Sequence, residues 1–525
     1  MRVAGIAPYA PWPTEAMPSG AVELRSWLTD RLVARMGPDA AVRDPCRSRV
    51  LESALTMRLL ERTGLRPDLY AAVETYVQRQ APETTGFERT MAEITLGGKN
   101  VRSDVLAEVV RAAPDFTGSR KRVLAQALLA VVGAPGEITW EPAAFDTAFL
   151  HSWASVQMTA AKVILAAVSG QSARISDEDV RCLADTQRAP RLWEGNVLIH
   201  LSVLHALTLL PNTGRLVAAG VDTLAAQVRS DGGLPFVSDV DTWCTATAGV
   251  ALAAVNAAEP TLRALADRLA ACQQPGGGWS YSDTAVQTDV DDTSVAVQFL
   301  DRVDSRRYRG SVRRGIRSLM AVRGTDGGFP TYVAGAASEA SMTAAALDAL
   351  TLRSDRHAGH IAEGLRFLVS QQNEDGSFPP DWSSSRLHTV CRVLLCTSRR
   401  PRSGSATVRR MVGRAAALVI GGQNDDGGWG QQAGDASDVI STAYGLTALC
   451  SIPDADPRAA AVAAEFLAHA PRGADGLQAI PDSIGPRPFV FTVPVLAEIF
   501  TLLALGHFDR RLAAPAARAQ GTTRG

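Results

Sequence analysis

Apolar residues recur three and four positions apart through most of the chain, a spacing that predicts helices. The segment 48–60, Ser-Arg-Val-Leu-Glu-Ser-Ala-Leu-Thr-Met-Arg-Leu-Leu, has this spacing and is rich in residues that favour helices. Similar patterns cover most of residues 21–132 and continue through 144–169, 177–186 and 196–210. The alternation of apolar and polar residues that is typical of strands is almost absent. We therefore predict an all-α fold.

The second half of the chain repeats a glycine turn that is closed by an apolar residue. This closing residue advances by 45 to 51 positions from one repeat to the next. An amphipathic pattern ends before most turns, and a segment with threonine and small apolar residues follows each one. Such a helix–turn–helix unit cannot bury its apolar face alone, so six units predict a closed α/α barrel of six helical hairpins. The turns are Asp231-Gly-Gly-Leu234, Gly276-Gly-Gly-Trp279, Asp326-Gly-Gly-Phe329, Asp375-Gly-Ser-Phe378, Asp426-Gly-Gly-Trp429 and Asp475-Gly-Leu477.

Three carboxylates stand in four residues at the start of one predicted inner helix: Asp289, Asp291 and Asp292. When the repeats are aligned on their threonines, acids recur at the position of Asp289. The other five repeats carry no acid at the positions of Asp291 and Asp292, so the scaffold does not require them there. Like charges in a dry site raise the pKa of at least one carboxyl, which then keeps a proton that it can donate. The alternative is an acidic helix start that favours the helix dipole, and Asp289 can cap the helix in either case.

Composition and charge exclude several classes of protein. The chain has 525 residues, 46% of them hydrophobic, and a formal net charge of −1, which gives no basic field for nucleic acid. Its seven cysteines are scattered without zinc-site spacing, as expected of reduced thiols in a cytoplasm. No uncharged apolar run reaches membrane-spanning length. We expect a cytoplasmic protein that has no integral membrane association, zinc or nucleotide; whether it forms a homodimer stays open.

The motif Asp289-Val-Asp291-Asp292-Thr293 resembles that of the class II terpene cyclases. Gly278-Trp279-Ser280-Tyr281 upstream and the glycine–aromatic repeats around it strengthen the likeness. This family includes the squalene–hopene cyclases and the diterpene cyclases that form copalyl diphosphate. The resemblance implies two α/α-barrel-type domains, known as the βγ architecture, with the six-hairpin barrel over residues 225–510.

The remaining segments are divided by the same resemblance. It implies a second helical domain, the γ domain, over residues 21–224, although a first helix of this region could belong to the other barrel. Residues 1–20 are rich in Pro, Ala and Gly and are expected to form a flexible leader. We expect residues 511–525 to form a disordered tail.

In this family the middle aspartate is the general acid, so the resemblance implies that Asp291 protonates the terminal alkene of a prenyl chain. Asp289 and Asp292 then match the flanking acids that orient and tune it. Ser341 or Glu339 is the candidate for the polar partner that the family places beside the acid. A carbocation needs a dry, aromatic-lined cavity, because ring faces stabilise positive charge by roughly 0.5–2 kcal/mol each. The aromatic candidates near inner-helix starts are Trp243, Trp279, Tyr281 and Phe236.

The substrate expected from the resemblance is a prenyl diphosphate that keeps its diphosphate, because the metal motifs of class I terpene synthases are absent. Our first hypothesis is cyclisation of geranylgeranyl diphosphate to a bicyclic labdane- or clerodane-type diphosphate, since the chain length suits two-domain bacterial diterpene cyclases. Farnesyl diphosphate giving a drimane-type diphosphate is the alternative. A zinc-dependent protein prenyltransferase-like barrel is a third hypothesis, although Asp241 and Cys244 lack a clear histidine partner.

The resemblance also implies Mg²⁺ at the diphosphate, and Lys162 is one candidate for binding that group. A class I synthase is expected to use the product. His388, at the Asp292-equivalent position two repeats further on, is either a terminating base or a core residue.

Overall fold

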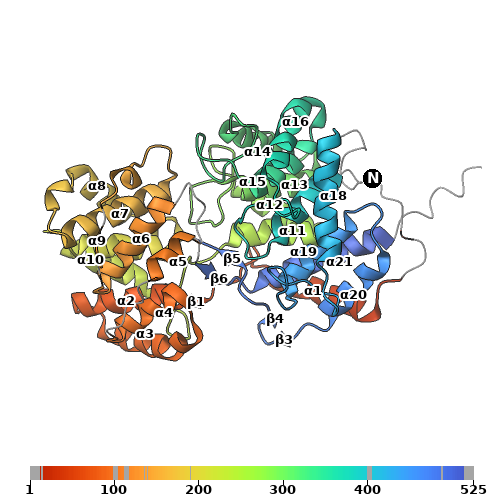
Figure 1. The fold of residues 1–525 in the computed structure, drawn as a ribbon. Helices are drawn as coiled ribbons and strands as arrows, with labels where there is room; N and C mark the ends of the chain where they lie inside the picture. Colours follow the sequence, from red (N-terminus) through yellow and green to blue (C-terminus); the bar gives the residue numbers. More distant parts are fainter. Residues whose placement is uncertain are drawn as a thin grey trace, which may run out of the picture.

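The structure, a computed structural model, describes Trp12 and residues 16–98, 104–111, 118–134, 136–138, 140–189, 191–398, 405–485 and 489–512. It contains two helical units that lie side by side (Figure 1). The strands in these ranges are only two residues long, and they pair into two-stranded sheets. The prediction of an all-α fold is therefore confirmed.

The N-terminal unit is built on buried helices that carry long apolar runs. Every residue of α9 is buried, and α9 packs against α7 and α2, while α6 packs against α7. Outer helices of the unit cover this core. Its helices are α2 (Val50–Thr63), α3 (Pro67–Gln80), α4 (Gly86–Thr95), α5 (Val105–Arg111), α6 (Gly118–Val131), α7 (Ser152–Val168), α8 (Asp177–Thr186), α9 (Val197–Leu207) and α10 (Gly214–Ala225).

The C-terminal unit is a closed barrel of helical hairpins, as the repeats predict. Each inner helix contacts the next, and the last contacts the first. The inner helices are α11 (Asp241–Ala254), α13 (Val290–Asp304), α15 (Ala340–Thr351), α17 (Leu387–Ser398), α19 (Val439–Cys450) and α21 (Val495–Leu512). The outer helices are α12 (Glu259–Ala271), α14 (Arg309–Val322), α16 (Ser354–Gln371), α18 (Ala406–Gly421), α20 (Pro457–Ala468) and α1 (Ser19–Ala34).

The N-terminal end of the chain differs from the predicted flexible leader. Helix α1 packs on α20 and α21, and so it belongs to the outer ring of the C-terminal barrel. Trp12 is buried: its backbone N–H donates to the Arg511 carbonyl (3.2 Å), and its ring lies 6.0 Å from that of Phe508. Residues 1–11 and 13–15 of the predicted leader lie outside the described residues, as do residues 513–525 of the predicted tail.

The glycine turns and the threonines that follow them form one repeated hydrogen-bonded unit. The Oγ1 of Thr293 accepts the backbone N–H of Trp279 (3.0 Å), and Thr442 does the same for Trp429 (3.0 Å). Gly277 has a φ of 93°, and a Cβ there would lie 2.7 Å from the Arg314 carbonyl oxygen. The turn therefore requires glycine at this position, and the threonine ties it to the start of the inner helix.

Three two-residue strand pairs complete the described structure. In one, β1 (Ser48–Arg49) pairs with β2 (Leu234–Pro235), which joins the start of the N-terminal unit to the segment that leads into the barrel. The second pairs β3 (Arg472–Gly473) with β4 (Gly476–Leu477). The third pairs β5 (Ser483–Ile484) with β6 (Val490–Phe491).

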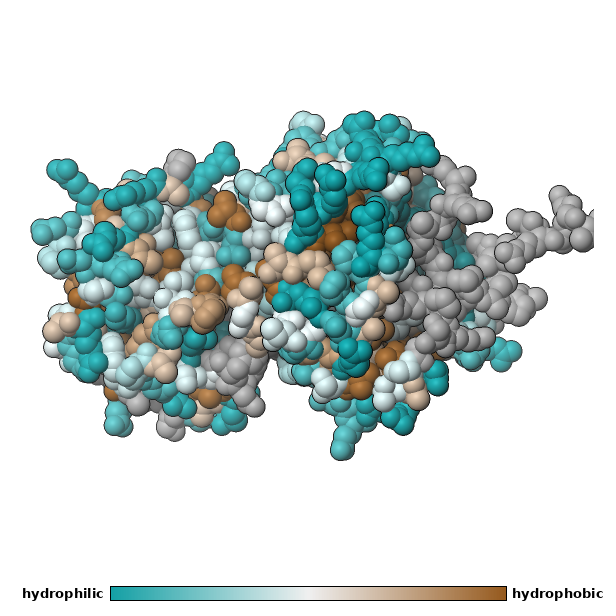
Figure 2. All heavy atoms as spheres, turned by 90° about the horizontal axis from the view of Figure 1, so that it is seen from above, coloured by the Kyte–Doolittle hydropathy of each residue, from teal (hydrophilic) through white to brown (hydrophobic). Residues whose placement is uncertain are grey.

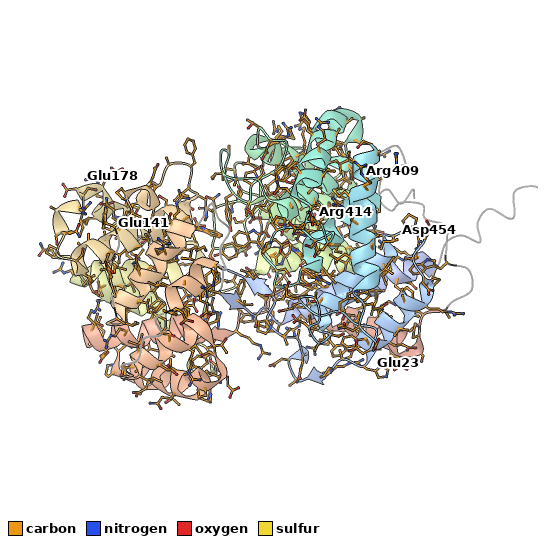
Figure 3. The ribbon with its side chains drawn as sticks, in the orientation of Figure 1. Glu23, Glu141, Glu178, Arg409, Arg414 and Asp454 are labelled. Atoms are coloured by element: carbon orange, nitrogen blue, oxygen red, sulfur yellow. The ribbon has the colours of Figure 1, made fainter. Side chains whose placement is uncertain are left out.

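The outer helices present charged side chains to solvent. Figure 3 labels Arg409 and Arg414 on α18 and Glu178 on α8, and all three side chains are exposed. In Figure 2 the apolar patches are scattered over the visible face of both units. Among the helices of the described ranges, none combines the length and the apolar character that crossing a bilayer would take.

Candidate active site

The three aspartates of the motif surround the start of α13. Asp289 caps this helix, because its Oδ1 accepts the backbone N–H of Asp292 at 2.8 Å. The Asp289 N–H in turn donates to the Trp279 carbonyl (3.1 Å), which fixes the cap to the glycine turn. Asp438 caps α19 in the same way, with its Oδ1 accepting the Ser441 N–H at 2.9 Å. An aspartate cap is thus shared between repeats, whereas Asp291 and Asp292 have no counterparts in the other repeats.

Burial raises the pKa of two acids in this cluster, so the cluster can hold a proton at neutral pH. Asp289 is 8% exposed and Asp292 is 4% exposed. Loss of hydration raises the pKa of Asp289 to about 7. Loss of hydration, with the charge of Asp289 beside it, raises the pKa of Asp292 well above the usual range of a carboxyl. Within the part of the chain that the structure describes, the buried Oδ1 of Asp292 has no hydrogen-bond partner. An unpaired buried oxygen costs less in a protonated carboxyl than in a carboxylate.

Asp291 points away from this pair toward α17 and meets an arginine. The Nη1 and Nη2 atoms of Arg392 donate to its two carboxylate oxygens at 2.7 and 2.8 Å. The side chain of Asp291 is 16% exposed and that of Arg392 is 15% exposed. Asp291 is therefore more accessible than Asp289 and Asp292. This two-point contact fixes the plane of the Asp291 carboxylate.

The polar partner of the acid is therefore not the one that the sequence suggests. Glu339 accepts from the indole N–H of Trp382 (3.1 Å) and from Thr331 instead, and the Ser341 hydroxyl has no partner among the described residues. Arg392 comes from two repeats further along the chain. The sequence did contain a signal for this contact. Arg392 is a single cation inside the apolar run of a predicted inner helix, and a buried cation needs an acidic partner.

Aromatic rings form a wall beside the start of α13. The Val290 N–H donates to the Thr331 carbonyl (2.9 Å), which places Tyr332 next to the acid cluster. The ring of Trp153, from the N-terminal unit, lies 5.0 Å from that of Tyr281 and 5.2 Å from that of Tyr332. Trp382 extends the wall, with its ring 6.0 Å from that of Tyr332. Trp153, Tyr332 and Trp382 were not among the aromatic residues expected from the sequence, because the repeat pattern does not place loops or the other domain.

Of the four aromatic residues expected from the sequence, two lie close to this wall. Tyr281 is part of it, and its hydroxyl donates to the Glu194 carbonyl. Trp243 is tied to it, because its backbone N–H donates to the Tyr281 carbonyl (3.1 Å).

The other two expected aromatic residues occupy different positions. Trp279 is fully buried, and its indole N–H donates to the Leu269 carbonyl (2.7 Å), as that of Trp429 does to Val419 (2.9 Å). Its repeated geometry indicates a role in helix packing. Phe236 lies between the two units, with the Arg49 guanidinium 5.5 Å from its ring centre.

Lys162 is engaged inside the N-terminal unit. Its Nζ lies 2.7 Å from Asp179, which belongs to the capping box at the start of α8. It stands nine residues after Trp153 on α7, roughly 13 Å along the helix axis. This ion pair does not direct the ammonium group toward the acid cluster. Diphosphate binding by Lys162 stays a prediction that the contacts do not support.

The expected Mg²⁺ site stays a prediction as well. Across the described ranges, no group of three or more His, Cys, Asp or Glu side chains is arranged to hold a metal ion. Mg²⁺ often needs only one or two carboxylates besides substrate phosphate oxygens.

The barrel and its acid cluster define a class of protein, and comparisons with known proteins agree. Residues 336–510 match the squalene–hopene cyclase C-terminal domain family, and residues 197–386 match the prenyltransferase alpha-alpha toroid domain family. The chain is 36% identical over 511 residues to a drimenyl diphosphate synthase of Streptantibioticus cattleyicolor, covering 93% of this chain and 95% of that one. A drimenyl diphosphate synthase of Streptomyces showdoensis is also 36% identical, over 510 residues that cover 93% and 94% of the two chains. The chain therefore belongs to the class II terpene cyclases and is an enzyme.

A solved structure shares the fold over nearly the whole length. It is the ent-copalyl diphosphate synthase from Streptomyces platensis, with a TM-score of 0.57, 18% identity, and coverage of 93% of this chain and 100% of that one. At this identity the likeness supports the two-unit fold and not a substrate.

Proposed function

We propose that this enzyme cyclises farnesyl diphosphate to a bicyclic, drimane-type diphosphate and leaves the diphosphate in place. The observation that carries the proposal is the 36% identity, over more than nine tenths of the chain, to two proteins that are both named drimenyl diphosphate synthases. A drimane skeleton has the carbon count of a farnesyl chain. This evidence favours the shorter substrate over geranylgeranyl diphosphate, which was our first hypothesis from the sequence.

The proposed reaction starts with a proton transfer from Asp291 to the terminal alkene. Asp291 is the most accessible acid of the cluster, and the two hydrogen bonds from Arg392 hold the plane of its carboxyl group. Asp289 and Asp292 keep a proton in the cluster, because burial raises the pKa of both. They are the groups from which Asp291 can be recharged.

Ring closure then needs no further catalyst, only a shaped and dry cavity. The protonated alkene leaves a tertiary cation, which the next alkene attacks to close the first ring. The last alkene closes the second ring, and loss of a proton from a carbon beside the final cation restores an alkene. The product is an isomer of the substrate. Rings such as Tyr281 and Tyr332 stabilise the cation by about 0.5–2 kcal/mol each while excluding water.

The test is incubation of the purified full-length chain with farnesyl and geranylgeranyl diphosphate in parallel, with Mg²⁺ present. The products are treated with phosphatase and identified as alcohols. A bicyclic drimane alcohol from farnesyl diphosphate, formed with a higher kcat/KM than any product of the longer substrate, is the expected result. A clear preference for geranylgeranyl diphosphate would overturn the choice of substrate, and no cyclic alcohol from either would overturn the proposed function.

A further inference from the structure

Residues 146–150 of the N-terminal unit, the strap, lie over a loop of the barrel. The Phe149 ring covers Gly335, because its Cδ1, Cε1 and Cγ atoms lie 3.2, 3.7 and 3.8 Å from the position that a Cβ on this glycine would take. Gly335 belongs to the 331–338 loop, which leads into the inner helix α15. The ring of Phe149 is therefore a contact between the two helical units.

The 331–338 loop is part of the candidate active site. Its Thr331 carbonyl accepts the Val290 N–H at the start of α13 (2.9 Å), and its Tyr332 belongs to the aromatic wall. The Glu339 N–H donates to the Phe329 carbonyl (2.9 Å), which closes the loop at its base. A side chain that rests on this loop thus lies at the end of the barrel that carries the acid cluster.

The backbone of Phe149 has an unfavourable conformation. The Leu150 N–H donates to the Thr147 carbonyl (3.1 Å), and Asp146 Oδ1 accepts the Ala148 N–H (2.9 Å), so the strap is a tight turn. Phe149 is the third residue of this turn and has a φ of 62°. Glycine and asparagine adopt this left-handed value more readily than an aromatic residue does. The turn by itself would be more stable with a different residue.

Packing in a core does not explain Phe149 either. It is 74% exposed, more than any other large apolar residue that the structure describes. The gain that an aromatic ring usually makes by leaving water is therefore mostly missing here. A backbone held in a sparsely populated conformation is found most often at active sites, ligand clamps and switch regions. The contact with the 331–338 loop is the feature that distinguishes this ring.

We propose that the strap is a flap over the entrance to the active site, and that it is closed when the Phe149 ring lies on Gly335. A prenyl diphosphate has to enter a site that then excludes water, so the entrance has to open and close in each turnover. A return of Phe149 to negative φ relieves the turn and takes the ring off the loop, whereas the ring contact opposes this change. This inference rests on the proposed function, because it requires a prenyl substrate, but it holds for either chain length.

The first test is a disulfide that fixes the strap in its closed position, formed by Phe149→Cys and Gly335→Cys in the full-length chain. Phe149 Cγ lies 3.8 Å from the Cβ position at residue 335, so a small adjustment brings two cysteines into bonding distance. The oxidised double variant should convert farnesyl diphosphate at least about 20-fold more slowly than the same protein after reduction. Phe149→Cys alone is the matched control, and oxidation should leave its rate unchanged.

Two results of this test would overturn the inference. One is a double variant that is crosslinked, as judged by mass spectrometry, and turns over as fast as its reduced form. The other is a folded double variant that does not crosslink under oxidation, because the strap and the loop would then not be in contact in solution.

Hydrogen exchange gives a second test that keeps Phe149 and Gly335 and does not depend on turnover. Asp291→Asn should bind farnesyl diphosphate without cyclising it, and amide exchange in residues 146–150 and 331–338 should slow at least about fivefold on binding. Unchanged exchange in both segments of the substrate-bound protein would contradict closure of the strap. If the wild type forms no cyclic product, the proposed function fails, whereas the strap is judged by exchange alone.

Discussion

At the scale of single residues, the contact between Asp291 and Arg392 distinguishes this site from a simple cluster of acids. The arginine forms two hydrogen bonds with one of three crowded acids, and burial raises the pKa of the other two. The acid that meets the arginine and the two buried acids thus have different surroundings at the same helix start.

Replacing this arginine tests that division. Arg392→Met removes both the cation beside Asp291 and the two hydrogen bonds that hold its carboxyl group. We expect kcat to fall by about 100-fold, in line with general acid catalysis, with a smaller change in KM. Steady-state kinetics with farnesyl diphosphate measures both. Arg392→Lys, which keeps the charge, should recover part of kcat, and equal activity of the two variants would contradict a role for the charge.

The raised carboxyl pKa values predict how activity depends on pH. The cluster must hold a proton, and burial raises the pKa of Asp289 from 3.8 to about 7. Activity should therefore be present below neutral pH and should fall as pH rises through about 7. The free energy of unfolding should fall as pH rises from about 4 to 7, because over that range the folded state holds a proton that the unfolded state has lost.

The measurement is a profile of kcat/KM against pH, with Asp289→Asn as the comparison. The variant removes one titrating carboxyl of the pair, so the alkaline limb should move. A wild-type profile that is flat from pH 6 to pH 9 would contradict the claim that activity requires a proton held by the Asp289–Asp292 pair.

At the scale of elements, each barrel repeat depends on one glycine with a left-handed backbone. Gly277→Ala combines an unfavourable φ of 93° with a Cβ 2.7 Å from the Arg314 carbonyl oxygen. We expect the free energy of unfolding to fall by about 2 kcal/mol. Gly276→Ala, one residue earlier, is the control, because a Cβ there meets no atom within 4 Å. Chemical denaturation of both variants measures the difference, and equal stability would show that the turn tolerates a side chain.

Local patterns in the chain were sufficient to predict the repeated elements. Glycine turns, threonines and helical periodicity recur within each unit, so alignment of the repeats predicts the barrel and isolates Asp291 and Asp292. Contacts between units leave no such pattern. Arg392, two repeats away, and Tyr332, in a neighbouring loop, were therefore missed. Trp279 was expected in the cavity because of its place after the turn, yet the same bond at Trp429 shows that the position serves packing.

At the scale of the whole molecule, the site is assembled from both helical units. Glu194 and Ser152 hold the N-terminal unit against the segment before the acid cluster, and Trp153 and His151 enter the aromatic wall from that side. The sequence indicates a second helical domain but no reason for it. The structure supplies one, since the barrel alone would lack Trp153, which is part of the aromatic wall beside the acid cluster.

The central claim is that Asp291 begins the cyclisation with a proton that exchanges with solvent. The most direct measurement is conversion of farnesyl diphosphate in D₂O by the wild type and by Asp291→Asn, followed by phosphatase treatment and mass spectrometry. The wild type should give a bicyclic alcohol that carries one deuterium at the ring carbon protonated by the acid, and the folded variant should give at least about 100-fold less of it. A cyclic product without deuterium, or an Asp291→Asn variant that retains wild-type turnover, would contradict this mechanism.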